Sequence, residues 1–274
     1  MLIKKSGRIY SNSFLNSKFV KFLRDRIMIS LLYDLFWVVL VTVLVIVTAI
    51  LWVLTVPFDR ARKIIHEVSR VWATGFFRLP LGWRRHHSGL ENLDSTKPYV
   101  IVVNHSSMID VPYLYFLPRM NFRWVAKKEV AKIPFFGQMC ALHGDIMVDR
   151  GTKKGALAVM EQGKMWLDRG VCVAIFPEGT RSKTGQMGAF KTGAFNLAKS
   201  AGVGILPVVL SGTDKTFKRS FYFRWRHDFG MKVLPIIPAE KVAETDLKEL
   251  MDNTREVMLA AKAQLDGEIA ASHK

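Results

Sequence analysis

The first long feature of the hydrophobic pattern is an uninterrupted apolar run. No charged residue occurs over residues 35–58, which read LFWVVLVTVLVIVTAILWVLTVPF. A helix of about 20 residues crosses the roughly 30 Å hydrocarbon core of a bilayer, so the run predicts a membrane helix. A secretory signal would have a shorter apolar region ending in small residues, which residues 52–58 lack. A wholly buried core helix rarely needs so long an apolar run.

Basic and amphipathic segments lie on either side of this run. Residues 1–26 interleave basic and apolar side chains, which suits an interfacial segment. Residues 59–79 carry apolar side chains at helical spacing, namely Ile64, Ile65, Val68, Trp72, Phe76 and Leu79. Because basic residues flank the apolar run at both ends, the positive-inside rule does not fix its topology. We expect either a single span or a helical pair that enters and leaves one leaflet.

Beyond residue 98, short apolar runs alternate with helical patterns. The expected strands are at about 99–103, 122–126, 145–148, 172–176, 204–210 and 231–235, and the expected helices lie near 111–117, 153–168, 190–200 and 246–266. This alternation predicts an α/β fold with a mixed, largely parallel sheet covered by helices. It would follow an N-terminal membrane-embedded and amphipathic helical segment.

Two domains are expected from this division. Residues 1–80 would form the N-terminal membrane segment and residues 81–274 the α/β domain. Proline and glycine residues mark 80–98 as a linker. Within that linker, residues 84–87 (RRHH) are expected to form a solvated or headgroup-facing basic patch.

The chain is strongly basic. It has 40 Lys and Arg residues against 23 Asp and Glu residues, a formal net charge of +17. Such an excess favours an anionic partner, either nucleic acid or an anionic membrane surface. Cys140 and Cys172 lack the spacing of a metal site or a disulfide framework. We therefore expect reduced core thiols in a domain that faces the cytosol.

The first candidate chemistry lies at a predicted strand-to-helix turn, where residues 104–110 read NHSSMID. His105 and Asp110 are not spaced to share one face of a regular helix. At a turn, however, the carboxylate can reach the imidazole. Such a pair activates a hydroxyl, because the carboxylate orients the imidazole that takes the proton from an alcohol. The alternative is a surface histidine beside a helix-capping aspartate.

Other charged residues also follow predicted strands. Lys127 and Lys128 follow the strand at 122–126, Arg150 follows 145–148, and residues 176–181 (FPEGTR) end the strand at 172–176. Ligands bind at the carboxyl edge of open α/β sheets, and a guanidinium suits a phosphate group. Arg150 and Arg181 therefore predict a phosphate site, and Glu178 a partner for a substrate hydroxyl. Each residue also has a simpler interpretation when it is considered alone. Arg150 could form a surface ion pair with Asp149, Lys128 could lie at an exposed helix start, and Glu178 could be a solvated turn residue.

In this order, residues 104–110, 144–150, 176–181 and 205–208 (ILPV) resemble the glycerolipid acyltransferase family. The resemblance is greatest to its 1-acylglycerol-3-phosphate O-acyltransferase (lysophosphatidic acid acyltransferase) branch, and it covers roughly residues 99–215. It implies transfer of an acyl group from acyl-CoA or acyl-carrier protein to the sn-2 hydroxyl of lysophosphatidic acid, giving phosphatidic acid. The family fold implies helices on a mixed sheet, with an N-terminal helical element at the membrane.

The resemblance also implies residue roles. His105 would be the general base, oriented by Asp110. The substrate-binding residues would be Lys128, with Lys127 as an equal candidate for the phosphate, and Arg150, Glu178, Gly179, Thr180 and Arg181. No bound cofactor or metal is expected, since a thiolate is already a good leaving group and the thioester is a co-substrate. The expected location is the membrane, with the catalytic domain at the cytoplasmic face.

The sequence leaves three alternative functions to consider. The same chemistry could act on another acceptor, such as glycerol 3-phosphate, a lysophospholipid or a lyso-form of an amino-acid lipid. A membrane-tethered nucleic-acid-binding protein is suggested by basic and aromatic residues over 215–232, but a helix-turn-helix or RNA-recognition signature is missing. Intact His105 and Asp110 argue against a lipid-binding protein that has lost catalysis. Ser106 and Ser107 lack the Gly-x-Ser-x-Gly turn, which disfavours an acyl-enzyme, and no phosphate-binding loop of nucleotide hydrolases occurs.

Overall fold

The computed structural model describes residues 35, 38–80, 82–149, 151–182, 184–216 and 226–272. The chain forms two compact units, Met1–Val47 and Thr48–Lys274. Within the described residues, one helix is long and apolar enough to cross a membrane, Val38–Thr55, with a mean hydropathy of 2.9. The predicted basic segment 1–26 lies outside the described residues. The division of the chain at residue 80 stays a prediction.

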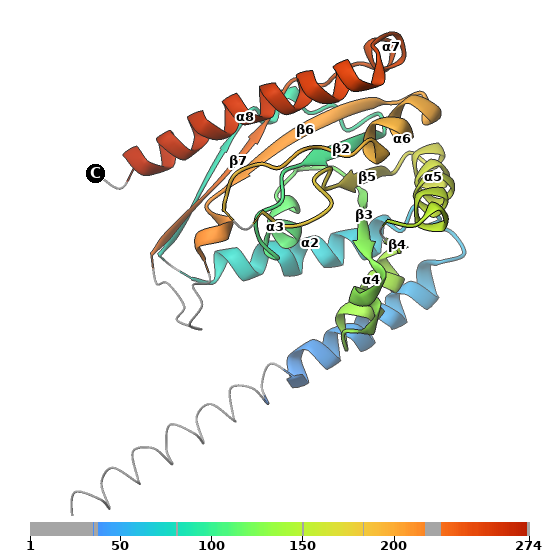
Figure 1. Ribbon diagram of the computed structural model, residues 1–274. Coiled ribbons are helices and arrows are strands. Elements are labelled where there is room, and N and C mark those ends of the chain that lie inside the picture. Colours follow the sequence, from blue (N-terminus) through green and yellow to red (C-terminus); the bar gives the residue numbers. More distant parts are fainter. Residues whose placement is uncertain are drawn as a thin grey trace, which may run out of the picture. The chain divides into compact units, whose positions relative to one another are not determined.

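The second unit is built on a seven-stranded sheet with the order β1-β7-β6-β2-β5-β3-β4 (Figure 1). Every pairing is parallel except that of β6 with β7. The mixed, largely parallel sheet expected from the sequence is therefore confirmed. The strands are β1 (Trp83–Ser88), β2 (Tyr99–Val103), β3 (Phe122–Lys127), β4 (Ile146–Val148), β5 (Cys172–Ile175), β6 (Gly204–Ser211) and β7 (His227–Val233).

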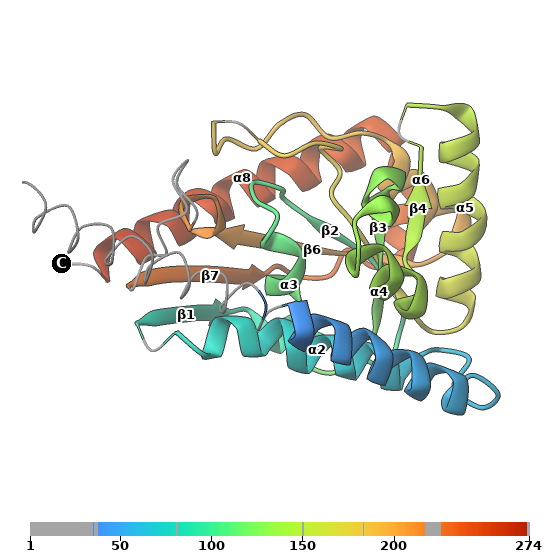
Figure 2. The same cartoon turned by 90° about the horizontal axis from the view of Figure 1, so that it is seen from below.

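Helices cover both faces of this sheet (Figures 1 and 2). One face packs against α5, α6, α7 and α8, and the other against α2 and α3. The helices are α2 (Lys63–Arg78), α3 (Asp110–Leu114), α4 (Phe136–His143), α5 (Lys153–Asp168), α6 (Gly193–Ala201), α7 (Ala239–Glu244) and α8 (Leu247–Ala271), with short 3-10 turns at η1 (Leu90–Asn92), η2 (Lys128–Lys132) and η3 (Thr213–Lys215).

Strand β2 shows how one apolar run serves both layers. Its fully buried Val100 and Val102 enter the core beneath α5, α6 and α8. Ile101 and Val103, also fully buried, enter the core with α2 and α3. Successive side chains of a strand point to opposite faces, so an unbroken apolar run is typical of a parallel strand covered on both sides.

The prediction of a linker over 80–98 is wrong. Trp83–Ser88 forms β1, which pairs in parallel with β7, and Leu90–Asn92 forms a 3-10 turn. The buried Trp83 ring packs on Phe77 and Phe229, with centroids 5.9 and 4.9 Å apart. An edge strand can be mostly polar, because it pairs with only one neighbour and is anchored here by a single apolar residue, Trp83. The sequence WRRHHS therefore lacks the alternation of apolar and polar residues by which a strand is predicted.

The basic patch expected within that linker is only partly solvated. Arg84 and Arg85 are exposed, but His86 and His87 are half-buried. His86 Nε2 lies 3.3 Å from a carboxylate oxygen of Asp228, and His87 Nε2 lies 3.2 Å from the Tyr113 hydroxyl. Pairing of β1 with β7 turns these two side chains toward partners that the local sequence does not reveal.

A buried polar cluster fixes α2 against the sheet. Fully buried Arg123 of β3 donates to the Ala61 carbonyl at 2.6 Å. His143 Nδ1 lies 2.7 Å from Asp145 Oδ1, and His143 Nε2 lies 3.0 Å from Nδ1 of His66 on α2. Burial lowers the pKa of both histidines, most strongly for His66, where the neighbouring His143 and Arg123 add to the effect. Both are therefore held neutral in the fold.

We expect this cluster to make the stability of the protein fall in mild acid. Above about pH 6.5, the ordinary histidine pKa, the two side chains are neutral in the folded and unfolded states. Below it, the unfolded chain binds protons that the folded chain does not, so the free energy of unfolding decreases with falling pH. His66→Gln removes one such group and should reduce this slope by up to about 1.4 kcal/mol per pH unit.

Chemical denaturation in detergent between pH 7.5 and 5 measures this slope. Ser69→Ala, a non-titrating change on the same helix, should keep the wild-type slope. Parallel pH curves for wild type and His66→Gln would contradict the role given to this histidine.

Candidate active site

Four loops leave the same edge of the sheet. They follow the carboxyl ends of β2, β5, β3 and β4, which are adjacent and parallel. The loop after β2 carries His105, the loop after β5 carries Glu178, and Lys128 follows β3 directly. In open α/β sheets this edge is where ligands bind. The expected site residues therefore come from neighbouring strands, although they are far apart in the chain.

The imidazole of His105 is paired with the carboxylate of Asp110. Nδ1 lies 2.8 Å from Oδ2 of Asp110, which also accepts the backbone N–H groups of Ser106 and Ser107 at 2.7 Å each. Asp110, the first residue of α3, is fully buried, whereas the His105 side chain keeps 11% of its surface exposed. Among the described residues no hydrogen-bond partner is present for Nε2 of His105. The pair can therefore present this nitrogen to a ligand.

Aromatic rings fix the plane of the imidazole. His105 stacks on Phe176 with centroids 3.8 Å apart and an interplanar angle of 12°. Phe176 in turn stacks on Trp124 at 4.8 Å and 20°. The sequence interpretation gave Phe176 no role beyond ending a strand. An aromatic residue at the end of a predicted strand was the only hint in the sequence. The stacking itself joins the loops after β2 and β5, so it could not be predicted locally.

Glu178 binds backbone groups on both sides of the site. Its side chain is buried, Oε1 accepts the His105 N–H at 2.7 Å, and Oε2 accepts the Gly188 N–H at 2.8 Å. The alternative of a solvated turn residue is therefore wrong. Gly179 follows with φ 73°, and a Cβ there would lie 2.9 Å from Nζ of Lys191. This turn requires glycine for its backbone conformation.

The remaining predicted residues lie nearer the surface. Lys128 begins η2 and forms an exposed ion pair with Asp149, which raises the pKa of the lysine. Thr180 and Arg181 are exposed directly after Gly179. Arg150 lies outside the described residues. The structure thus joins His105 to Asp110 and to Glu178 by direct hydrogen bonds. Lys128 is paired with Asp149, the residue directly before Arg150.

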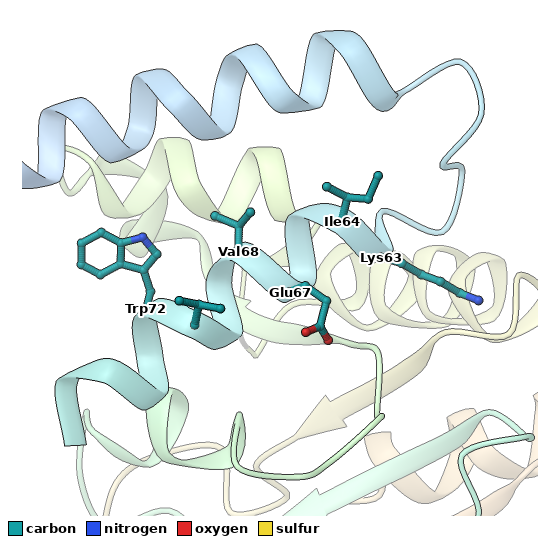
Figure 3. Close-up of a pocket in the computed structure, with 6 residues that line it drawn as sticks. Lys63, Ile64, Glu67, Val68 and Trp72 are labelled. Atoms are coloured by element: carbon teal, nitrogen blue, oxygen red, sulfur yellow. The ribbon is translucent and has the colours of Figure 1, made fainter. Parts of the chain in front are cut away.

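A separate apolar depression lies on α2. It has a volume of about 460 Å³, and Figure 3 shows lining side chains that come from successive turns of the helix. The lining residues are Lys63, Ile64, Glu67, Val68, Val71 and Trp72. Val71 is 64% exposed and Ile64 38% exposed, so this side of α2 presents an apolar patch that is not packed against the sheet. None of these residues belongs to the predicted site at the sheet edge.

The described residues contain no group of three His, Cys, Asp or Glu side chains arranged to hold a metal. Cys140 and Cys172 are both free thiols. Burial raises the pKa of both, that of Cys172 to about 12, so neither is a ready nucleophile. Proton transfer by His105 is one kind of chemistry that the described geometry can support.

Residues 84–211 match the family model described as Acyltransferase. This segment contains β2 to β6 and the hydrogen-bonded set of His105, Asp110 and Glu178. Residues 84–211 form an acyltransferase-family domain. The resemblance inferred from the motifs is therefore confirmed.

Curated relatives agree with this family. A 1-acyl-sn-glycerol-3-phosphate acyltransferase of Helicobacter pylori is 40% identical over 131 residues, 47% of this chain and 55% of that protein. The human 1-acyl-sn-glycerol-3-phosphate acyltransferase alpha is 34% identical over 184 residues, 65% and 63% of the two chains. A chloroplastic 1-acyl-sn-glycerol-3-phosphate acyltransferase of Arabidopsis thaliana is 34% identical over 159 residues, 56% and 43%. The chain thus spans about half the length of the curated relatives it matches.

A solved structure shares the fold. The crystal structure of the 1-acyl-sn-glycerophosphate (LPA) acyltransferase PlsC from Thermotoga maritima has a TM-score of 0.62, with 21% identity. The likeness covers 83% of this chain and 95% of that one. The shared fold therefore extends beyond the segment that matches the family model.

Proposed function

We propose that the protein transfers a fatty acyl group from an acyl thioester to the sn-2 hydroxyl of 1-acylglycerol 3-phosphate, giving phosphatidic acid. The observation that carries this proposal is the 2.8 Å contact between His105 and Asp110 at the ligand-binding edge of the sheet. The names of the relatives from Helicobacter pylori and human support the choice of acceptor.

His105 acts as the general base in this proposal. Neutral Nε2 takes the proton of the sn-2 hydroxyl while the oxygen attacks the thioester carbon, and Asp110 stabilises the imidazolium that forms. The tetrahedral oxyanion then collapses, the carbon–sulfur bond breaks, and the thiolate takes the proton from the imidazolium. General-base assistance of this kind is worth about 10²–10⁴-fold in rate.

Cations at the same edge bind the acceptor phosphate. Arg181 is exposed two residues after Gly179 and offers planar, bidentate hydrogen bonding to a phosphate. Arg150 and Lys128 are assigned to the same phosphate, while Glu178, Gly179 and Thr180 shape the turn beside the glycerol. The net charge of +17 further favours an anionic substrate and surface.

Loss of the Arg181 guanidinium should mainly weaken acceptor binding. Arg181→Ala is expected to raise the KM for 1-acylglycerol 3-phosphate by about 10- to 100-fold, since a charge-assisted hydrogen bond contributes about 1.5–3 kcal/mol. The KM for the acyl donor should change little. Steady-state kinetics with each substrate varied in turn measures both. Arg119→Ala, which precedes β3 at the opposite edge, is the control, and an unchanged acceptor KM in Arg181→Ala would remove the phosphate assignment.

The membrane supplies the acceptor in this proposal. The apolar helix Val38–Thr55 anchors the chain, and the depression on α2 lies against lipid acyl chains. A lysophosphatidic acid keeps its tail in the leaflet, so the catalytic domain works at the interface. We assign this domain to the cytoplasmic face, with either acyl-CoA or acyl-carrier protein as donor.

The direct test uses full-length protein in detergent micelles with 1-acylglycerol 3-phosphate and either a long-chain acyl-CoA or an acyl-carrier-protein thioester. Thiol release and phosphatidic acid formation are followed together, with His105→Ala as the control. Product that depends on His105 supports the proposal and names the donor. Thiol release without phosphatidic acid would point to another lysolipid acceptor. No release from either donor, in folded protein, would refute the catalytic assignment.

A further inference from the structure

A series of hydrogen bonds connects the C-terminal helix to the backbone of His105. Arg255, on α8, donates from Nε to the Gly188 carbonyl at 2.7 Å and from Nη2 to the Met187 carbonyl at 3.0 Å. The Gly188 N–H donates to Oε2 of Glu178 at 2.8 Å, and Oε1 of Glu178 accepts the His105 N–H at 2.7 Å. Each member of the series is thus bonded to the next.

The middle of this series is closely packed. Glu178 is 7% exposed and Met187 is 5% exposed. A Cβ added to Gly188 would lie 3.3 Å from Oε2 of Glu178, so the peptide and the carboxylate are in tight contact. Both hydrogen bonds to the carboxylate are charge-assisted, which makes them stronger than neutral ones. A shift of the Gly188 peptide would therefore be passed to the carboxylate.

The loop that carries Gly188 has no regular structure of its own. Between β5 and α6 the described residues form no helix or strand. Besides the bond to Glu178, the loop is held by the Ser182 N–H on the His105 carbonyl and by the Lys191 N–H on the Pro177 carbonyl, both at 2.8 Å. The guanidinium of Arg255 adds two bonds to consecutive carbonyls. Its rigid fork suits this paired geometry, which a lysine ammonium cannot reproduce.

We propose that Arg255 is a positioning residue for His105 and acts through Gly188 and Glu178. The proposal rests on the proposed function of His105 as general base. By holding two carbonyls, Arg255 sets the direction of the Gly188 N–H, and through the carboxylate it sets the backbone from which the imidazole projects. Arg255 lies outside residues 84–211, so the matched family segment does not contain it.

Turnover provides the first test. Arg255→Leu should lower kcat by about tenfold and leave both KM values within about twofold, because misplacement of a reacting group by about 1 Å can cost about 100-fold. Arg255→Lys should recover only part of the lost kcat, because a lysine ammonium can bond one of the two carbonyls well but not both. Lys248→Leu, which removes an exposed cation from the same helix, is the matched control and should behave as wild type. An unchanged kcat in Arg255→Leu, or an equal loss in Lys248→Leu, would overturn the proposal.

Amide hydrogen exchange provides a test that does not depend on turnover. In Arg255→Leu, exchange should become at least about threefold faster in the peptides that contain Gly188 and His105, while β6 keeps its wild-type rate. Faster exchange at Gly188 alone would overturn the connection to His105. If wild type and His105→Ala showed equal turnover while both peptides responded, the proposed function would fail and the hydrogen-bond connection would stand.

Discussion

Replacement of His105 by alanine is expected to lower kcat by about 10²–10⁴-fold, the usual contribution of a general base. The side chain stacks on Phe176 and bonds Asp110, and these contacts hold Nε2 in position to take the hydroxyl proton. The KM values should change much less, because the imidazole acts on the hydroxyl during the reaction and contributes little to binding the acyl chain or the phosphate.

The experiment compares wild type, His105→Ala and His86→Ala with saturating donor and acceptor. His86 is a half-buried histidine on β1, at the far end of the sheet order from β5 and β3. Its replacement should leave kcat near the wild-type value. Unfolding curves establish that each variant is folded. Near-normal turnover in folded His105→Ala would mean that another group takes the proton, and the mechanism proposed here would be wrong.

Much of the fold could be predicted because its strands carry a strong local signal. The apolar run of β2 fills the cores on both faces, and its predicted bounds, 99–103, match the strand. The helix predicted at 153–168 likewise matches α5. In these elements local periodicity and long-range burial favour the same structure. Where the two agree in this way, the element can be predicted from the sequence alone.

Elements with a weak periodic pattern were missed. β1 is polar apart from Trp83, and it exists because β7 offers a ladder partner. α4, of eight residues, and α7, of six, are too short for a helical repeat to stand out. Their structure is determined by neighbours distant in the chain, which no local pattern records.

The candidate site divides in a similar way. The pairing of His105 with Asp110 followed from a local turn, since His105 lies just after β2 and Asp110 is the first residue of α3. The bonds of Glu178 to two separate backbone amides did not, because they depend on how the loops after β2 and β5 meet. Arg255 reaches the site from the last helix and carried no motif signal.

Asp110→Asn is expected to give the second large effect, a fall in kcat on the order of 10³-fold. The amide oxygen can replace Oδ2 as acceptor for the His105 ring and for the Ser106 and Ser107 N–H groups, so the local geometry can persist. The negative charge that stabilises the imidazolium is lost, however, and proton transfer to His105 becomes less favourable. The loss should therefore appear in kcat more than in either KM.

The same substitution should also reduce stability by about 1–3 kcal/mol, because the hydrogen bonds to Oδ2 are no longer charge-assisted and the buried amide brings two unpaired donors. Oδ1 of Asp110 is buried without a partner among the described residues, and the asparagine NH₂ would occupy its place. Asp110→Ala would leave three donors unsatisfied and damage the fold more, so asparagine is the cleaner test. Kinetics and chemical denaturation are measured on the same preparations, with Asp94→Asn, a half-buried aspartate that precedes β2 at the opposite edge, as the control. Folded Asp110→Asn with near-wild-type kcat would show that the carboxylate holds the loop but does not assist His105, because the hydrogen bonds alone would then suffice.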